Sequence, residues 1–375
     1  MTTSTQPGTV RATLRNPADL IASLPYLLGF RPADSLVLLG HQRPGTKIGL
    51  ILRADLPPRE LQASQADALI PRFADSRHDG VTAVLIGGSA DEDGPPHADF
   101  VDELSRALSV HQLRLFHALW TPSVHTGAPW SCYRHADCTG VLPDPQETVV
   151  AAATTEAGFM VFPSREDLAA LLDPRCPETV ARRARLLAAS PEPLRLPGMA
   201  HSDVLAAAVL EIRAAFGRQR RGEGPPDDDQ AMCLAHALSL TPVRDACLAL
   251  AVPAHTPLAR EAEDVWLSLV RELPAPHRAE AALQLGYTAL MRGEGALAGM
   301  ALANATEADP ANLAACLLHT AWSLGTDPAK LTGLAQSDTA VDLGLAPPPS
   351  VDASDAATEA PAGQERRPEP PTGLR

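Results

Sequence analysis

Apolar and polar positions over residues 10–145 form short runs that predict strands separated by helices. Four mostly apolar runs end near glycine or turn residues, which is typical of strands covered on both faces. These runs span residues 35–40, 48–54, 81–87 and 113–120. Apolar residues at helical spacing over 59–73 and 97–110 separate the later runs. Strands that alternate with helices of this length predict a layered α/β domain over residues 10–145, with a partly parallel sheet.

A helix is predicted ahead of the first long strand. Asn16 suits the capping position, Pro17 the first helical position, and Gly29 the residue at which the helix ends. The apolar residues between Pro17 and Gly29, Leu24 among them, repeat at helical spacing. One face of this helix is therefore expected to be buried.

From Glu147 onward the pattern changes to alanine- and leucine-rich helical spacing without a convincing strand. We expect a helical region over 146–222 and an all-helical domain over 227–334, joined by a linker-like segment at 222–229 (GEGPPDDD). Within the domain predicted over 227–334, several small and apolar residues and a proline fall at the spacings of a tetratricopeptide repeat. These residues are Gly286, Ala298, Leu302, Ala305 and Pro310. The pattern does not recur one period upstream, so it favours a tetratricopeptide-like helical hairpin packed on its neighbours over a peptide-binding groove.

Both ends of the chain are predicted to be disordered. The N-terminal segment is residues 1–9, and the C-terminal tail is residues 335–375. The tail is rich in proline, alanine, serine and acidic residues, and it cannot bury enough apolar surface to offset its chain entropy.

Charge and hydropathy exclude two classes of partner. The formal net charge is −14, from 45 acidic and 31 basic residues, whereas nucleic-acid binders need a basic face. No apolar stretch reaches the roughly 18 residues of a membrane span. We therefore expect neither nucleic acid nor a membrane as a partner. The six cysteines are scattered, which favours reduced thiols in the cytoplasm over a disulfide scaffold.

A candidate ligand site lies where an apolar strand ends at Gly87 and Gly88. Ligands of open α/β sheets bind beyond the carboxyl ends of strands. Arg31 and Asp34 lie in the turn before the first long strand, and Tyr26 lies in the helix that precedes this turn. The alternative, which we favour, is structural: helix-start, helix-stop and turn chemistry account for this segment, with Asp34 bonding free backbone amides.

A second candidate site is the segment around Cys132, His135 and Cys138, which offers three ligand types that zinc accepts. Structural zinc sites usually have two separated ligand pairs, and this chain has no second cysteine pair; His125 is a remote fourth ligand. A disulfide is the remaining alternative. We expect unligated thiols in an ordered loop, with no metal and no other cofactor.

Several segments resemble an uncharacterised actinobacterial family, domain of unknown function 4192. The most specific are residues 16–20 (NPADL), 25–30 (PYLLGF) and 32–37 (PADSLV). Residues 130–138, 163–168 and the alanine-rich repeat that ends at Asp309-Pro310 are also similar to it. The likeness covers most of residues 10–330. It implies the fold, and it implies neither an activity nor catalytic residues.

The chain contains no phosphate-binding loop, and neither a nucleophile elbow nor a cysteine beside a base lies in the setting that such chemistry needs. We therefore assign no catalytic residue. The leading hypothesis is a binding protein that docks a protein partner through its helical domain. The alternative is an enzyme or small-molecule binder with a pocket between the α/β and helical domains.

Overall fold

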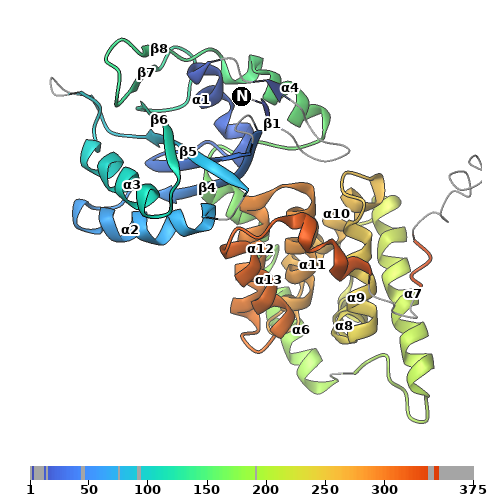
Figure 1. Ribbon diagram of the computed structural model, residues 1–375. Coiled ribbons are helices and arrows are strands. Elements are labelled where there is room, and N and C mark those ends of the chain that lie inside the picture. Colours follow the sequence, from blue (N-terminus) through green and yellow to red (C-terminus); the bar gives the residue numbers. More distant parts are fainter. Residues whose placement is uncertain are drawn as a thin grey trace, which may run out of the picture.

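The computed structural model describes most of the chain. The residues it describes are 2–3, 12–13, 16–43, 47–74, 77–90, 94–190, 192–336 and 342–345. They form an α/β unit and a helical unit that adjoin each other (Figure 1).

Within the described residues, a mixed sheet of eight strands forms the centre of the α/β unit (Figure 1). In order across the sheet they are β2 (Ala12–Thr13), β1 (Thr2–Thr3), β4 (Lys47–Asp55), β3 (Ser35–Gln42), β5 (His78–Ile86), β6 (Arg114–Thr121), β7 (Pro129–Cys132) and β8 (Thr139–Val141). β5 and β6 are parallel, whereas β3 pairs antiparallel with both β4 and β5. The predicted α/β domain with a partly parallel sheet is confirmed.

Helices cover both faces of the sheet, which gives the unit three layers. They are α1 (Pro17–Leu28) and α4 (Val149–Glu156) on one face, and α2 (Gln62–Leu69) and α3 (Ala98–Val110) on the other. Successive residues of a strand point to opposite faces. Leu36 and Leu38 of β3 therefore pack beneath α2 and α3, and Val37 and Leu39 pack beneath α1.

The segment 130–138, interpreted from the sequence as an ordered loop, takes part in a β-hairpin. β7 and β8 pair antiparallel, with Trp130 opposite Gly140 and Ser131 opposite Thr139. The loop interpretation missed this hairpin because β8 is exposed at all of its positions. A strand that buries neither face carries no apolar alternation, which is the pattern from which strands are inferred.

The α/β unit continues past the boundary expected at residue 145. Val150 of α4 joins the core beneath α1. Phe162 bonds the backbone on both sides of Phe30: its N–H donates to the Gly29 carbonyl oxygen over 2.9 Å, and its carbonyl oxygen accepts from Arg31 N over 3.0 Å. The chain therefore leaves the α/β unit only after Phe162.

The two helical segments expected over 146–222 and 227–334 pack together as one unit from α5 onward. Its helices are α5 (Arg165–Ala169), α6 (Pro177–Ala189), α7 (His201–Arg220), α8 (Asp228–Ser239), α9 (Thr241–Leu248), α10 (Pro257–Glu272), α11 (Arg278–Arg292), α12 (Gly295–Ala308) and α13 (Leu313–Ser323). α7 joins the segments by packing against both α8 and α10. Among the described residues, every helix is too short or too polar to span a membrane.

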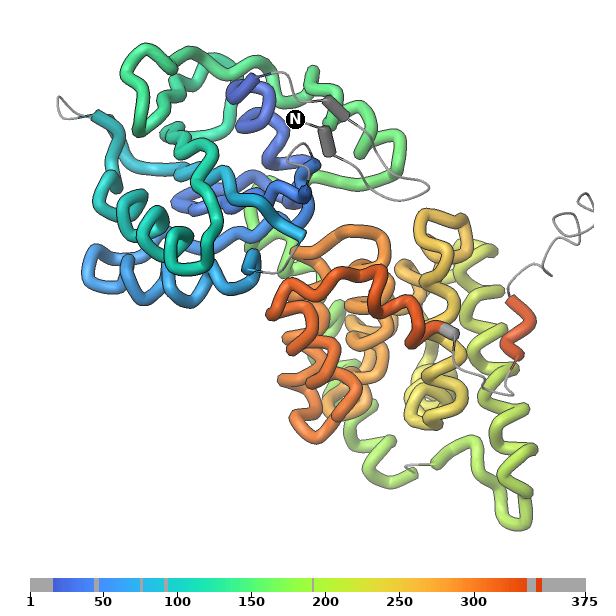
Figure 2. Tube along the Cα trace, in the orientation of Figure 1, coloured from blue at the N-terminus to red at the C-terminus, as the bar shows by residue number. Residues whose placement is uncertain are grey.

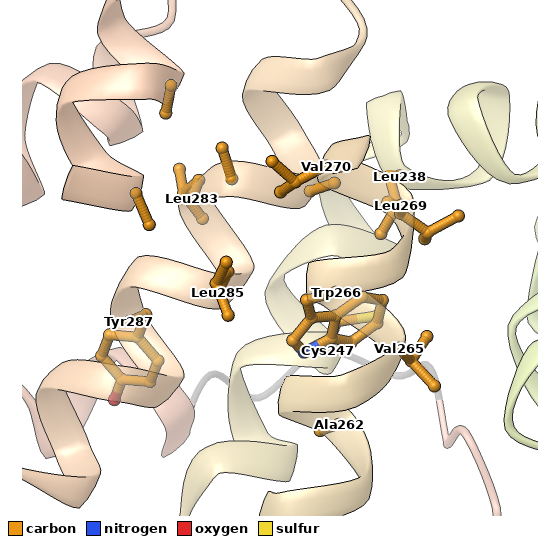
Figure 3. Packing of buried hydrophobic residues seen from close by; sticks show 14 of the residues in the cluster. Leu238, Cys247, Ala262, Val265, Trp266, Leu269, Val270, Leu283, Leu285 and Tyr287 are labelled. Carbon is orange, nitrogen blue, oxygen red and sulfur yellow. The ribbon is translucent and has the colours of Figure 1, made fainter. Parts of the chain in front are cut away.

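The core of the helical unit contains large aromatic side chains from different helices. Trp266 of α10 is fully buried, and its ring meets Phe216 of α7 edge-on with 5.8 Å between centroids. Figure 3 shows Trp266 and Tyr287 in this core among leucine and valine side chains. The unit thus closes around apolar residues supplied by helices far apart in the sequence.

The predicted helical hairpin is formed by α11 and α12. Gly286 lies so close to α12 that an added Cβ would be 2.6 Å from Leu302 Cγ and 3.3 Å from the Ala298 carbonyl oxygen. Small residues at this crossing are therefore required, as the repeat-like spacing indicated. α10 packs against α11, and α13 against α12, so the hairpin belongs to a longer stack of helices.

The segment that follows α13 meets the α/β unit near α2 (Figure 2). Arg72 Nε donates to the Ser323 carbonyl oxygen over 2.6 Å. Leu50 of β4 lies against Gly325, where an added Cβ would be 2.9 Å from Leu50 Cδ2. These polar and apolar contacts join the two units.

The two segments predicted to be disordered are described only in part. Thr2–Thr3 form β1, which pairs with β2 and β4. Near the other end, Leu343 is buried in the helical core, and the Arg213 side chain of α7 donates to its carbonyl oxygen. Residues 337–341 and 346–375 lie outside the described residues.

We expect Leu24→Ala to destabilise the protein by about 2–5 kcal/mol, because Leu24 is fully buried between α1 and the sheet and its loss leaves a cavity. Leu27 lies on the same helix but is only partly buried, so Leu27→Ala is the matched control and should cost less. Urea titrations that give the free energy of unfolding measure both variants. Equal losses would contradict the packing of α1 on the sheet.

Candidate functional site

The structure brings together two of the predicted ligand residues, Asp34 and Gly87. The register of β3 on β5 pairs Ser35 with Ile86, so the turn before β3 meets the end of β5. Both residues have left-handed backbone, with φ of 43° and 125°. A Cβ added to Gly87 would lie 2.6 Å from Asp34 Oδ1. The Asp34 carbonyl oxygen accepts a hydrogen bond from Leu56 N over 2.9 Å. Only glycine therefore fits beside this turn.

Two aromatic side chains fix the neighbouring backbone. Trp120 Nε1 donates to the Gly87 carbonyl oxygen over 2.8 Å. The Tyr133 hydroxyl donates to the Pro96 carbonyl oxygen over 2.6 Å, and burial raises the pKa of Tyr133. An added Cβ on Gly88 would lie 3.0 Å from Pro96 Cγ. The sequence reasoning did not include these aromatic side chains, and their contacts support a structural role for the turn.

The remaining predicted ligand residues lie apart from this contact. Tyr26 is partly buried at the margin of the core beneath α1. Arg31 is exposed, and its backbone N–H is bonded to Phe162 as described above. Of the five predicted residues, only Asp34 and the two glycines therefore belong to one cluster of turns at the carboxyl end of β5.

The zinc candidates Cys132, His135 and Cys138 lie in the β7–β8 hairpin. Both cysteines are free, Cys132 buried and Cys138 half-buried. Nowhere in the described part of the chain do three or more His, Cys, Asp or Glu side chains gather in a way that suits a metal ion.

Two adjoining cavities lie in the helical unit, at the ends of α6, α7, α8 and α10. The larger has a volume of about 620 Å³ and the smaller about 280 Å³, and Arg175 and Pro225 line both. The segment 222–229, interpreted from the sequence as a linker, supplies residues to both walls. Sequence reasoning missed these cavities because helices distant along the chain build them.

The charged groups of the larger cavity are mostly paired with one another. Arg182 Nε and Arg183 Nε donate to the Asp228 carboxylate over 2.6 Å and 3.0 Å. The hydrogen bond from Arg182 lowers the pKa of Asp228 to about 2. Arg183 Nη1 donates to Glu272 Oε2 over 2.7 Å. Few of these groups are left for a ligand.

The smaller cavity combines an apolar wall with arginine side chains. Its apolar lining includes Ala215, Leu234, Val265, Leu267 and Leu269. Arg175, Arg218 and Arg271 line it as well, with Glu223 and Asp264 as the acidic residues. Arg218 Nη2 is buried and has no hydrogen-bond partner among the described residues. Partial burial raises the pKa of Asp264. The site therefore suits an anion that carries an apolar body.

A third cluster places two carboxylates on one buried guanidinium. Arg292 of α11 pairs with Glu263 of α10, and its Nη2 lies 3.1 Å from Glu294 Oε1. The guanidinium carbon lies 5.2 Å from the centre of the Phe159 ring. Burial raises the pKa of Glu263, and it raises the pKa of Glu294 to about 7. Burial also lowers the pKa of the nearby His255.

The sequence contained one signal for this third cluster. Glu263 lies four residues after Ala259 and three before Trp266, which are both fully buried residues of α10. A charged residue inside an apolar stripe needs a partner. The identity of that partner follows only from the packing of α10 on α11.

The fold and these sites define a protein with a three-layer α/β unit, a helical unit and an arginine-lined cavity. The chain belongs to the family described as domain of unknown function DUF4192, whose model matches residues 17–329. The resemblance inferred from the sequence is thereby confirmed. No curated protein and no solved structure matches the chain.

Glu294 should make stability depend on pH. A carboxyl whose pKa rises from 4.5 to about 7 on folding binds more protons in the folded state, so stability falls as pH rises through this window. Urea titrations at about pH 5 and about pH 8 should therefore show a larger loss of stability for the wild type than for Glu294→Gln. Glu307→Gln, at an exposed position of α12, should behave as the wild type. An unchanged pH dependence in Glu294→Gln would contradict the assignment.

Proposed function

We propose that the protein binds a small organic anion in the smaller cavity of the helical unit. The observation that carries this proposal is Arg218 Nη2, a buried donor at the cavity that has no acceptor among the described residues. A buried donor without a partner costs about 1–3 kcal/mol. An anionic oxygen of a ligand would remove that cost through a charge-assisted hydrogen bond.

The surroundings of Arg218 support the same class of ligand. Together with Arg218, Arg175 and Arg271 give the lining of this cavity three arginines. Its acidic residues are two, Glu223 and Asp264. Arginine binds carboxylates and phosphates bidentately. The leucine and valine side chains of the wall favour a hydrocarbon body.

The proposed activity is binding rather than catalysis. Among the side chains that line the smaller cavity, Ser268 is the one hydroxyl, and no histidine or lysine lies there to activate it. We place this activity in the cytoplasm, because the six cysteines are scattered along the chain in a way that is typical of proteins without a disulfide scaffold.

Isothermal titration calorimetry with hexanoate, hexyl phosphate and hexylamine tests the proposal. We expect the wild type to bind one or both anions and to ignore the amine. Arg218→Gln should weaken anion binding about tenfold or more, because it removes a charged donor. Arg185→Gln, at an exposed position of α6 that does not line the cavity, is the matched control and should bind as the wild type.

Comparison of hexanoate with hexyl phosphate identifies the anionic group that the cavity accepts. The proposal would be wrong if the wild type bound the amine as tightly as the anions. It would also be wrong if Arg218→Gln bound the anions with wild-type affinity.

A second proposal concerns the partner expected at the helical unit: we propose that α13 docks onto a second copy of this chain. α13 is the one α-helix of the described residues that contains no Asp, Glu, Lys or Arg. Leu313, Leu317 and Leu324 are exposed by 70%, 61% and 63%. Leu313 and Leu317 lie one turn apart on α13, and Leu324, the residue that caps the end of the helix, continues the same stripe.

The net charge of the chain opposes self-association, so a contact between two copies needs a surface without charged side chains, as α13 provides. Two chains with a net charge of −14 repel each other, and that repulsion is least where they meet through a helix without charged side chains. A symmetric contact between two copies of α13 would cover the same apolar stripe on both chains, which is the usual geometry of homodimers.

Sedimentation velocity over a range of protein concentrations tests this contact. We expect a monomer–dimer equilibrium for the wild type and a monomer for Leu317→Glu, which places two like charges in the interface. Leu210→Glu, on α7, is the control, because Leu210 is similarly exposed at 62% but lies outside the stripe. A wild type that stays monomeric at every concentration would rule out the second copy as the partner.

A further inference from the structure

Cys132 and Cys138 lie opposite each other in the β7–β8 hairpin. The register that pairs Trp130 with Gly140 and Ser131 with Thr139 continues to Cys132 opposite Cys138. Cys132 N donates to the Cys138 carbonyl oxygen over 2.9 Å, which confirms that the two residues face each other. Cα atoms of opposite residues are about 4.5–5.5 Å apart, within the range of about 4.4–6.8 Å that disulfides span.

The two thiols differ in their exposure and act on each other. Cys132 is buried, whereas Cys138 is half-buried and open to a reagent. Burial raises the pKa of Cys138, and the neighbouring Cys132 thiol raises it further. The two sulfur atoms belong to facing positions of the hairpin. Because the reactive species is the thiolate, the raised pKa of Cys138 makes its thiol slow to react at neutral pH and faster as pH rises.

We propose that Cys132 and Cys138 form a reversible disulfide site whose oxidant is a small-molecule disulfide. The Cys138 thiolate attacks one sulfur of the oxidant, whose S–S bond breaks and releases one thiolate. The Cys132 thiolate then attacks Cys138 Sγ and displaces the other half of the oxidant as a second thiolate. The protein loses two protons and two electrons, and the oxidant becomes two thiols. The new bond ties β8, the exposed edge of the sheet, to β7.

This pair is distinct from the other cysteines and from the proposed ligand site. Cys247 is fully buried in the helical core, and burial raises the pKa of its thiol. Cys316 lies on α13 and is half-buried. The anion-binding cavity is lined by residues of the helical unit, so the redox pair and that cavity can be tested separately.

Trypsin provides a direct readout, because Arg134 lies between the two cysteines. Full-length native protein is incubated with oxidised glutathione at about pH 8, alkylated to block the remaining thiols, and digested without reduction. A disulfide joins peptides 115–134 and 135–165, each of which contains one cysteine. We expect this linked pair in the mass spectrum, and we expect it to separate after reduction.

Variants distinguish the two chemical steps. Cys132→Ser should stop after the first step and retain one glutathione on Cys138. Cys138→Ser should leave the buried Cys132 unmodified. Cys316→Ser is the matched control and should form the linked peptides as the wild type does. Circular dichroism melts establish that each variant is folded.

Three results would overturn the proposal. The first is a wild type that keeps glutathione on Cys138 without closing the bond. The second is a linked pair that forms only in urea, which would show that the folded hairpin holds the sulfurs apart. The third is protection of both thiols by one equivalent of zinc that a chelator removes, which would assign the hairpin to a metal.

Discussion

The buried guanidinium of Arg183 is the interaction on which the helical unit depends. Arg183 of α6 is only 3% exposed. It donates to Asp228 at the start of α8, to the Pro226 carbonyl oxygen, and to Glu272 at the end of α10. A buried ion pair stabilises a fold only when its donors are satisfied, and loss of one partner costs about 3–5 kcal/mol. Three helices and the preceding loop are therefore positioned by one side chain.

This network also determines which arginines are available for a ligand. It fixes the loop before Asp228, and that loop forms one wall of both cavities. The donors of Arg183 are bonded to its partners, whereas Arg218, at the neighbouring cavity, has no partner for its Nη2 within the described part of the chain. The two arginines differ because of their surroundings. The Arg183 guanidinium lies where helix ends supply carboxylate and carbonyl oxygens. The Arg218 guanidinium lies beside the apolar residues of α8 and α10. An ionised donor beside apolar groups is costly to the fold and useful for binding an anion.

The Arg292 cluster contains more carboxylates than cations, whereas arginines outnumber acidic residues at the smaller cavity. One guanidinium serves both Glu263 and Glu294, and burial makes a second negative charge unfavourable. A proton therefore takes the place of a second cation near neutral pH. The contacts of Phe159 with Arg292 bring this cluster to the segment that leaves the α/β unit.

The sequence by itself determined the elements whose signals are local. Asn16 caps α1 by accepting from Asp19 N over 2.8 Å, and Gly29 ends that helix with φ of 80°, both as its residue types predicted. The strands buried on both faces and the helical hairpin at Gly286 followed from the spacing of residue types, and the family followed from the resemblance of short segments such as residues 16–20. Tertiary structure decided the rest, because it depends on residues far apart in the chain. The exposed strand β8 had no apolar pattern. The helices that pack around Arg218 leave its Nη2 without a hydrogen-bond partner among the residues described. Charges pair by proximity in space, which a linear sequence does not record.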